Sequence, residues 1–274
     1  MQVPVYRVLG LCYPCSPYSK FEKASAAALG YLGGMYIDDL FANHLLFMAT
    51  HRGSVRLEDM DLYIEGPSPS LVSFIPGSPD SVLPDRCPAV RLAPWSGGDS
   101  WDQRLEAQGY RRAEALSYME LGDPSRPLAP TSGIAIDIAR DESAAEAFAA
   151  IQSAGFATGD EAIDDWWKHY FLERARKNYK HPAQRLYLGR VGDQFVTSTL
   201  IVRTSGVSGI YAVATRPDFR RRGVGTAVLD RARVDAVQSG FPRIILQAMR
   251  GSYAESYYTK LGFLTRYISQ VWRR

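Results

Sequence analysis

The stretch Arg220-Arg221-Arg222-Gly223-Val224-Gly225-Thr226 joins a predicted strand to a predicted helix. Upstream, residues 209–215 are rich in β-branched and aromatic side chains, and Arg216-Pro217-Asp218 should end that strand. Downstream, apolar residues recur at helical spacing, namely Val224, Ala227, Val228, Ala232 and Ala236. The sequence therefore predicts a strand, a basic glycine turn and a helix whose N-terminus begins at the turn.

This turn has the chemistry of an anion site. The first turn of a helix leaves N–H groups unpaired, and glycines let a ligand approach them without a Cβ in the way. Three adjacent arginines add positive charge, and the helix dipole favours phosphate at the same end. A pyrophosphate is the ligand that these features favour. A solvated basic turn capped by glycine is the alternative that the loop alone leaves open.

Length and composition limit the class of protein. A chain of 274 residues is long for one domain, and 46% hydrophobic with 22% charged residues is typical of a globular protein. A net charge of +3 argues weakly for an anionic ligand and against a nucleic-acid surface. No apolar run approaches the roughly 20 residues of a membrane span, and no secretion signal is recognised. We therefore expect a cytoplasmic protein with neither a membrane nor a nucleic-acid partner.

Three cysteines cannot complete a disulfide framework. Cys12 and Cys15 have the spacing of a metal knuckle or a redox pair, but a structural zinc site needs four ligands and only Cys87 remains. We expect partly buried thiols and no metal site.

The chain is predicted to divide at a linker that contains Gly122, Pro124, Pro127 and Pro130. This gives an N-terminal domain over residues 1–130 and a C-terminal domain over residues 131–274. In the first, residues 18–49 predict helices, with His44 as a packed core histidine. Seven prolines between residues 66 and 94 favour short strands, such as 71–75 and 89–93.

The second half alternates strands and helices. Strands are predicted at 134–138, 185–190, 194–202, 209–215, 243–248 and 266–272, and helices at 141–153 and 164–177 as well as after the basic turn. The helix at 164–177 carries Trp166, Trp167, Tyr170 and Phe171. A packed core helix is the favoured interpretation of these aromatics, and lining of an acceptor pocket is the alternative.

Residues 134–272 resemble the GNAT family of acyl-CoA-dependent N-acetyltransferases. The family signature is Arg or Gln, two residues, Gly, one residue, then Gly or Ala, and the basic turn from Arg220 to Gly225 satisfies it. The turn also follows Val213-Ala214-Thr215-Arg216-Pro217 and precedes Tyr258-Thr259-Lys260-Leu261-Gly262-Phe263 at the spacing of the family. Together these motifs make the resemblance specific.

The resemblance implies a site for acetyl-CoA. Val213 and Thr215 would offer backbone groups to the pantetheine arm, and Tyr258 would donate a proton to the departing thiolate, as a phenol with a pKa of about 10 can. The pyrophosphate would be held by Arg220, Arg221, Arg222, Gly223, Val224, Gly225 and Thr226. Packing alone is the other interpretation of Tyr258.

The chain departs from the family in two places. Where the family often has an asparagine after the strand at 244–248, this chain has Met249-Arg250-Gly251-Ser252. In addition, no carboxylate lies on the strand at 209–215 to deprotonate an ammonium group. The base could come from the aromatic helix or from a chain of waters, and the candidates on that helix are Asp164, Asp165, His169 and Glu173.

An internal repeat is the further expectation. Residues 105–110 (Leu-Glu-Ala-Gln-Gly-Tyr) resemble residues 258–263 (Tyr-Thr-Lys-Leu-Gly-Phe), and each segment lies between two predicted strands. In the first copy Leu105 replaces the tyrosine, and residues 70–90 hold no basic glycine turn. The first copy would thus be a degenerate GNAT-like domain that braces the active one or closes its acceptor cleft, unless the similarity arises by chance.

The predicted fold class is α/β (α+β), with two GNAT-like domains in tandem, each a mixed, mostly antiparallel sheet flanked by helices, and only the C-terminal one complete. The predicted activity is transfer of the acetyl group of acetyl-CoA to a small-molecule or peptide amine by direct attack. A CoA-binding sensor, an inactive module, and a transferase that uses another acyl-CoA or an aminoacyl-tRNA stay open. So do the acceptor, the acyl chain length and the oligomeric state, including a homodimer.

Overall fold

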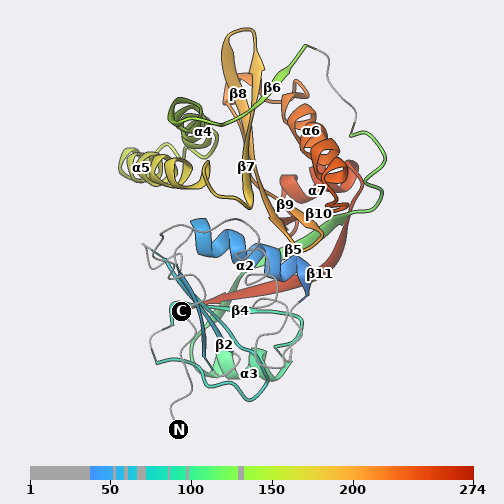
Figure 1. The fold of residues 1–274 in the computed structure, drawn as a ribbon. Coiled ribbons are helices and arrows are strands. Elements are labelled where there is room, and N and C mark those ends of the chain that lie inside the picture. The colour runs from blue at the N-terminus through green and yellow to red at the C-terminus, as the bar shows by residue number, and fades with distance from the viewer. Residues whose placement is uncertain are drawn as a thin grey trace. The chain divides into compact units, whose positions relative to one another are not determined.

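The structure is a computed structural model that describes residues 38–51, 54–58, 61–66, 72–85, 87–96, 99–128 and 133–274. The chain forms two compact units, and Figure 1 labels most of their elements. Unit 1 comprises Met1–Glu120 and Gln247–Arg274, and unit 2 comprises Leu121–Leu246. Of the helices in the described ranges, none is long and apolar enough to cross a membrane.

Unit 1 is a mixed sheet with three described helices. In chain order its elements are α2 (Asp39–His51), β1 (Ser54–Glu58), β2 (Asp61–Glu65), β3 (Ser73–Ile75), β4 (Ala89–Leu92), α3 (Asp99–Ala107), β5 (Arg111–Leu121), α7 (Tyr253–Lys260) and β11 (Phe263–Arg273). Its strands follow the order β1-β2-β3-β4-β11-β5. The β1–β2, β2–β3 and β4–β11 pairs are antiparallel, and the β3–β4 pair is parallel.

The C-terminal strand belongs to unit 1. Strand β11 pairs antiparallel with β4, from Gln270 opposite Leu92 to Arg273 opposite Ala89. Trp272 is 1% exposed and packs in one core cluster with Phe74, Val90, Leu92, Trp101, Leu105 and Tyr110. The predicted C-terminal domain of residues 131–274 therefore differs from the observed division, because burial of Trp272 fixes the last strand in the sheet of unit 1.

Two polar side chains of this core, Cys87 and Tyr110, are hydrogen-bonded to backbone carbonyls. Tyr110 donates its hydroxyl hydrogen to the carbonyl oxygen of Cys87 over 2.5 Å, and the Cys87 thiol donates to the carbonyl oxygen of Ala89. Burial raises the pKa of the Cys87 thiol, which makes it an inert core residue. Cys12 and Cys15 lie outside the described residues. Within those residues no group of three or more His, Cys, Asp or Glu side chains could hold a metal ion.

His44 is a core histidine, as predicted. It is 4% exposed, and its Nδ1 lies 2.7 Å from the Tyr118 hydroxyl oxygen. Phe41 stacks on the same tyrosine with ring centroids 5.5 Å apart. The histidine therefore joins α2 to β5 and has a packing role.

The two segments of the predicted repeat share one local structure. In the first, α3 ends at a turn in which Gly109 has a φ of 82°, and β5 follows. In the second, α7 ends at a turn in which Gly262 has a φ of 94°, and β11 follows. Both turns need glycine because a positive φ strains a residue with a Cβ. The aromatic residue after each glycine, Tyr110 or Phe263, is buried.

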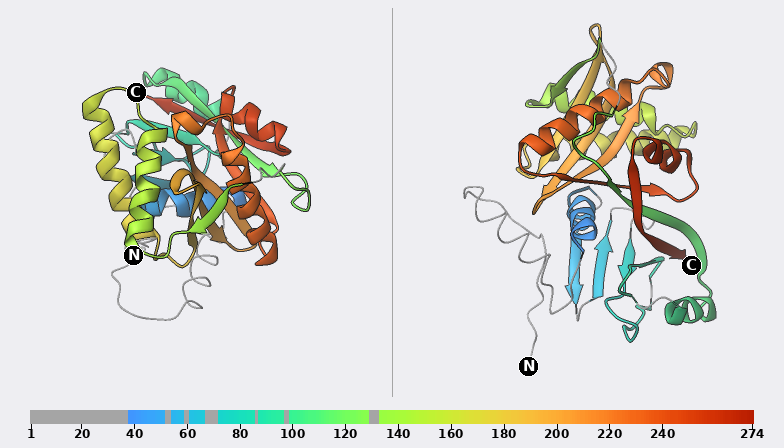
Figure 2. Two further views of the ribbon diagram at one scale, coloured as in Figure 1. Left: turned by 90° about the horizontal axis from the view of Figure 1, so that it is seen from above. Right: turned by 90° about the vertical axis from the view of Figure 1, so that its right-hand side faces the viewer.

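Unit 2 is a second mixed, mostly antiparallel sheet. Its elements are β6 (Ala135–Ile138), α4 (Glu142–Gly155), α5 (Glu161–Asn178), β7 (Gln184–Val191), β8 (Gln194–Thr204), β9 (Val207–Thr215), η2 (Pro217–Phe219), α6 (Val224–Gln238) and the first four residues of β10 (Arg243–Met249). The strand order is β10-β9-β8-β7-β6, in which β6–β7, β7–β8 and β8–β9 are antiparallel and β9–β10 is parallel. Figures 1 and 2 show α4 and α5 on one face of this sheet and α6 on the other.

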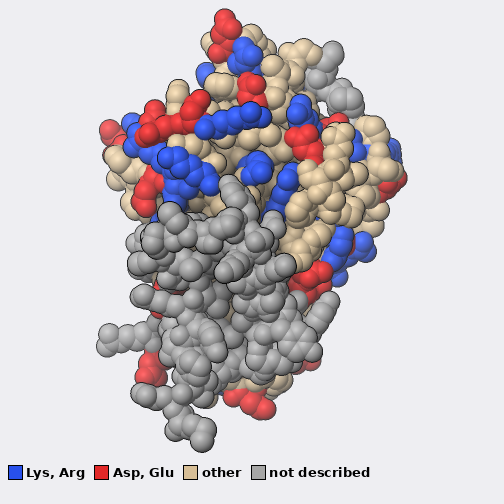
Figure 3. Space-filling view, viewed as in Figure 1, with Lys and Arg blue, Asp and Glu red and all other residues tan. Residues whose placement is uncertain are grey.

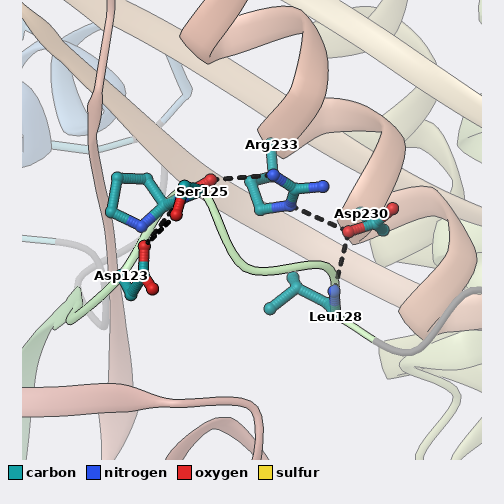
Figure 4. A network of polar contacts seen from close by, with 6 residues as sticks. Asp123, Ser125, Leu128, Asp230 and Arg233 are labelled. Carbon is teal, nitrogen blue, oxygen red and sulfur yellow. Dashed lines mark hydrogen bonds and ion pairs between the residues drawn. The ribbon is translucent and has the colours of Figure 1, made fainter.

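The predicted linker is part of unit 2. Figure 4 shows Asp230 and Arg233 of α6 facing the segment that runs through Leu128. Arg233 is 6% exposed; its Nε donates to Asp230 Oδ1 over 2.8 Å, and its Nη1 donates to the carbonyl oxygen of Pro124 over 2.7 Å. Leu128 donates its backbone N–H to the same carboxylate oxygen. Residues 121–128 are thus fixed to α6 by a buried ion pair that leaves no charge uncompensated.

Gly189 in β7 allows α6 to pack closely on the sheet. A Cβ at this position would lie 2.5 Å from Thr197 Cγ2 and 2.7 Å from Val228 Cγ2. Both neighbours are buried and β-branched, so neither side chain can move aside.

We expect Gly189→Ala to lower the free energy of unfolding by about 1–3 kcal/mol, because it overpacks the contact between β7 and α6. Urea denaturation of the full chain measures this loss. In a Val228→Ala background the same substitution should cost much less, since the clashing methyl group is gone. A loss below about 0.5 kcal/mol in the wild-type background would contradict the close packing.

Candidate functional site

Strand β9 contains a bulge. Its register with β8 runs from Thr215 opposite Thr197 to Ala214 opposite Ser198, and then shifts to Tyr211 opposite Leu200. Ala212 and Val213 therefore both face one residue of β8, and Ala212 has a φ of 48°. A non-glycine residue at positive φ is strained, so other contacts must hold this conformation.

The contacts that hold the bulge come from α4 and β8. Gln152 of α4 is 1% exposed, and its Nε2 donates to the carbonyl oxygen of Ala212 over 2.5 Å and to Ser198 Oγ over 2.7 Å. On β8, the Thr197 hydroxyl donates to the carbonyl of Ala214, and the Thr199 hydroxyl donates to that of Tyr211. Three carbonyl groups of the bulged segment, those of Tyr211, Ala212 and Ala214, thus accept hydrogen bonds from buried side chains.

Strand β9 pairs with β8 along one edge and with β10 along the other, and the bulge lies just beyond the last residue that pairs with β10. The parallel register with β10 runs from Val207 opposite Arg243 to Ile210 opposite Leu246 and stops there. Val213 therefore lies outside the registers of both neighbouring strands. Backbone N–H and C=O groups at such a position suit an extended ligand that carries amides.

The basic turn follows directly. Arg221 has a φ of 60° and Gly223 a φ of 75°, and α6 begins at Val224 with Gly223 as its N-cap. Residues whose φ values alternate in sign point successive N–H groups into a concavity that binds anions. The backbone N–H groups of Val224 and Gly225, at the start of α6, also lack intrahelical acceptors, and no side-chain hydrogen bond caps the helix. The turn is therefore a backbone anion site at a helix N-terminus.

The predicted pyrophosphate residues differ in what their side chains do. Arg220 donates from Nη2 to the carbonyl of Gly155 over 2.9 Å and from Nε to that of Thr215 over 3.2 Å. Its guanidinium is thus bound to the protein itself, and the Thr215 carbonyl already has a donor. Val224 is buried, so it presents only its backbone. Arg221 and Arg222 are exposed, and no ion pair involves either within the described residues.

The second predicted partner, Tyr258, belongs to unit 1 and lies in α7. It is 8% exposed and packs edge-on to Phe263 with ring centroids 5.8 Å apart. Burial raises the pKa of its phenol above the ordinary value, and the adjacent Tyr257 adds to the rise. No hydrogen bond to the Tyr258 hydroxyl is found among the described residues.

The residues that replace the asparagine of the family have a structural role. Ser252 caps α7 by accepting the backbone N–H of Glu255, and Glu255 in turn accepts the backbone N–H of Gly251 and the hydroxyl of Ser117. These hydrogen bonds, led by that from Ser117, lower the pKa of the Glu255 carboxyl. The bond from Glu255 to Ser252 is one half of a capping box, and the Glu255 carboxylate binds Gly251, the residue before the cap. Sequence reasoning missed this cap, although the Ser252-x-x-Glu255 spacing signals it.

The predicted base candidates on α5 have different surroundings. Asp164 accepts hydrogen bonds from the backbone N–H and hydroxyl of Thr158 and from the N–H of Gly159, and these bonds lower its pKa. It therefore orders the loop between α4 and α5. Asp165, His169 and Glu173 are exposed.

The aromatic side chains of α5 pack mostly on one another. Tyr170 is buried, and Trp166 stacks on it with ring centroids 5.1 Å apart while remaining 39% exposed. Trp167 stacks on Phe171 at 5.2 Å. The buried Tyr170 agrees with the favoured prediction of a packed core helix, whereas Trp166 is partly exposed to solvent.

In Figure 3, basic and acidic side chains are interspersed over the visible face of the described residues.

Comparison with known proteins supports one family. Residues 145–263 match the acetyltransferase (GNAT) family. A GCN5-related N-acetyltransferase from Kribbella flavida has a similar fold, with a TM-score of 0.60 and 14% identity over 85% of this chain and 94% of that one. A tandem GNAT protein from the clavulanic acid biosynthesis pathway has a TM-score of 0.54 and 11% sequence identity, and the match covers 91% of each chain. A Drosophila protein has a TM-score of 0.58 and 10% sequence identity, and the match covers 94% of this chain and 97% of that one.

No curated protein matched the chain. At these identities the structural neighbours show the fold alone, which is mixed α/β with mostly antiparallel sheets, as predicted. The family match spans the bulge in β9, the basic turn and α7. Residues 145–263, which contain these three features, are thus similar to the GNAT acetyltransferase family.

Proposed function

We propose that the chain is an N-acetyltransferase that transfers the acetyl group of acetyl-CoA to an amine. One observation carries the proposal: a strand end with a fixed bulge leads within ten residues to a helix N-terminus flanked by basic residues. The bulge offers backbone partners to the amides of pantetheine, and the turn offers N–H groups and positive charge to the diphosphate. Both features lie in unit 2 on one continuous segment.

Direct attack fits these parts. The amine nitrogen attacks the thioester carbonyl carbon, the new C–N bond forms, and the C–S bond breaks. The thiolate takes up one proton and the amine loses one. Holding two substrates in reactive geometry supplies most of the acceleration, and no covalent enzyme intermediate is needed.

We assign the proton donor for the thiolate to Tyr258. The assignment rests on the family resemblance and on the surroundings of the phenol, since burial keeps it protonated at neutral pH. The amine proton would go to Asp165, His169 or Glu173, or to water, because the carboxylate of Asp164 already binds Thr158 and Gly159. Leu105, at the corresponding place in the first copy of the repeat, has no ionisable group and cannot act as a proton donor.

Arg220 is assigned a positioning role. Its bonds to the carbonyls of Thr215 and Gly155 tie the end of β9 to the end of α4. The turn that follows is thereby held in the conformation that exposes its N–H groups.

The test of the activity is release of free thiol from acetyl-CoA with a panel of amines, amino acids and peptides. We expect turnover with at least one acceptor class, and none with Gly225→Glu, whose carboxylate should weaken CoA binding at least about 100-fold by repelling the diphosphate. Gln238→Glu adds the same charge at the other end of α6 and should leave binding intact. CoA binding without turnover across the panel would favour a sensor, and normal CoA affinity in Gly225→Glu would contradict the loop assignment.

Tyr258→Phe removes one hydroxyl and keeps the ring that packs on Phe263. Turnover should fall about 100-fold while acetyl-CoA affinity stays within about twofold, because the proton is needed only as the thiolate leaves. The raised phenol pKa also means that wild-type turnover should not decline through loss of this proton up to about pH 9. Steady-state kinetics and calorimetry measure both quantities, and unchanged turnover would remove Tyr258 from its role.

Arg220→Gln should lower the free energy of unfolding by about 1 kcal/mol, since two hydrogen bonds from a charged group to exposed carbonyls are lost. Arg221→Gln is the matched control, because it removes the same charge and should leave stability unchanged. CoA affinity should depend less on salt in Arg221→Gln than in Arg220→Gln. The reverse order of salt dependence would show that Arg220 contacts the diphosphate.

A further inference from the structure

The arginines around the basic turn do not share one role. Arg216 donates to both carboxylate oxygens of Asp218, from Nη2 over 3.1 Å and from Nε over 3.3 Å. Arg220 is held by two backbone carbonyls. The positive charges of Arg221 and Arg222 are balanced by no carboxylate among the described residues. Charge for an anionic ligand therefore comes from these last two.

Arg222 differs from Arg221 in having an aromatic ring beside its guanidinium. Its guanidinium carbon lies 5.2 Å from the centre of the Phe219 ring, within the range of a cation–π contact. Phe219 is half-buried at the end of η2, and Arg216 lies 5.6 Å from the same ring. Asp218 neutralises the charge of Arg216. Of the two arginines beside the Phe219 ring, Arg222 is therefore the one whose positive charge is available to a ligand.

The position of that charge is informative. The N–H groups that suit a diphosphate belong to Gly223, Val224 and Gly225, at the start of α6. The side chain of Arg222 is instead held on η2, the segment before the turn. Coenzyme A carries a second anionic group, the phosphate on the 3′ oxygen of its ribose. A separate cation beside the diphosphate site suits this second phosphate.

We propose that Phe219 is a positioning residue that holds the Arg222 guanidinium for the ribose 3′-phosphate of CoA. The proposal rests on the function proposed above and names the part of the ligand that this chain recognises with a side chain. The ring fixes a long side chain before the ligand arrives, so less conformational entropy is lost on binding. The contact is exposed, which limits its effect on affinity to about two- to fivefold.

The experiment compares the dissociation constants of CoA and 3′-dephospho-CoA by calorimetry on the full chain. The wild type should bind CoA at least about tenfold more tightly, because a charge-assisted contact to phosphate is lost with dephospho-CoA. Arg222→Gln should bind the two ligands equally. The Phe219→Leu variant should bind CoA about two- to fivefold more weakly than the wild type and should bind 3′-dephospho-CoA equally well. The Phe219→Tyr variant should bind CoA as the wild type does, because the ring is kept.

Two controls accompany these variants. Phe241→Leu removes a similar contact in the same unit, since Arg203 lies 5.0 Å from the Phe241 ring, and it should change neither affinity. Dephospho-CoA affinity in Phe219→Leu reports whether the turn has kept its structure. Phe219→Leu should add nothing in the Arg222→Gln background, because the two residues act as a pair.

The outcomes separate the two proposals. If Phe219→Leu weakens both ligands equally, or if the wild type does not discriminate between them, the assignment to the 3′-phosphate is overturned while the CoA site stands. If the wild type binds neither ligand, the proposed function fails and this inference fails with it.

Discussion

The buried amide of Gln152 contacts the most strained residue of the backbone on which the site depends. Gln152 donates to the carbonyl of Ala212, the one residue of β9 with a positive φ. This bond offsets part of the strain of a bulge in which two residues of β9 face one residue of β8. The bulge in turn leaves Val213 outside the register with β8.

The helix that carries Gln152 is itself positioned by a close contact with the same strand. A Cβ on Gly155, at the end of α4, would lie 2.8 Å from the Cβ of Ala214. Only glycine permits this approach, and it brings the carbonyl of Gly155 to the guanidinium of Arg220. Helix α4, the end of β9 and the basic turn therefore form one interlocked assembly within unit 2. Its rigidity is the kind of preorganisation that anion binding by backbone groups requires.

Much of this arrangement could be predicted from local sequence. Apolar periodicity located the helices and strands of unit 2, and Pro217 marked the end of β9. The matching turns around Gly109 and Gly262 agree with the predicted repeat. These features are local, so a short window of sequence contains their cause.

The remaining features depend on contacts between distant residues. The bulge follows from the pairing of β9 with β8 and from Gln152, which lies 60 residues away from Ala212 in the chain. The partner of Arg220 is likewise 65 residues away. Strand β11 joins β4 of unit 1 because of Trp272, so the division of the chain could not be read from its proline-rich segment. Propensity carries no information about which strand becomes a neighbour.

The central claim is that backbone groups of β9 and of the start of α6 hold an acyl-CoA. A crystal structure of the full chain with acetyl-CoA tests it most directly. The account predicts diphosphate oxygens about 3 Å from the backbone nitrogens of residues 223–225, and a pantetheine amide paired with the backbone of Val213. A diphosphate bound instead by the side chain of Arg220, or a cofactor bound away from β9, would contradict it.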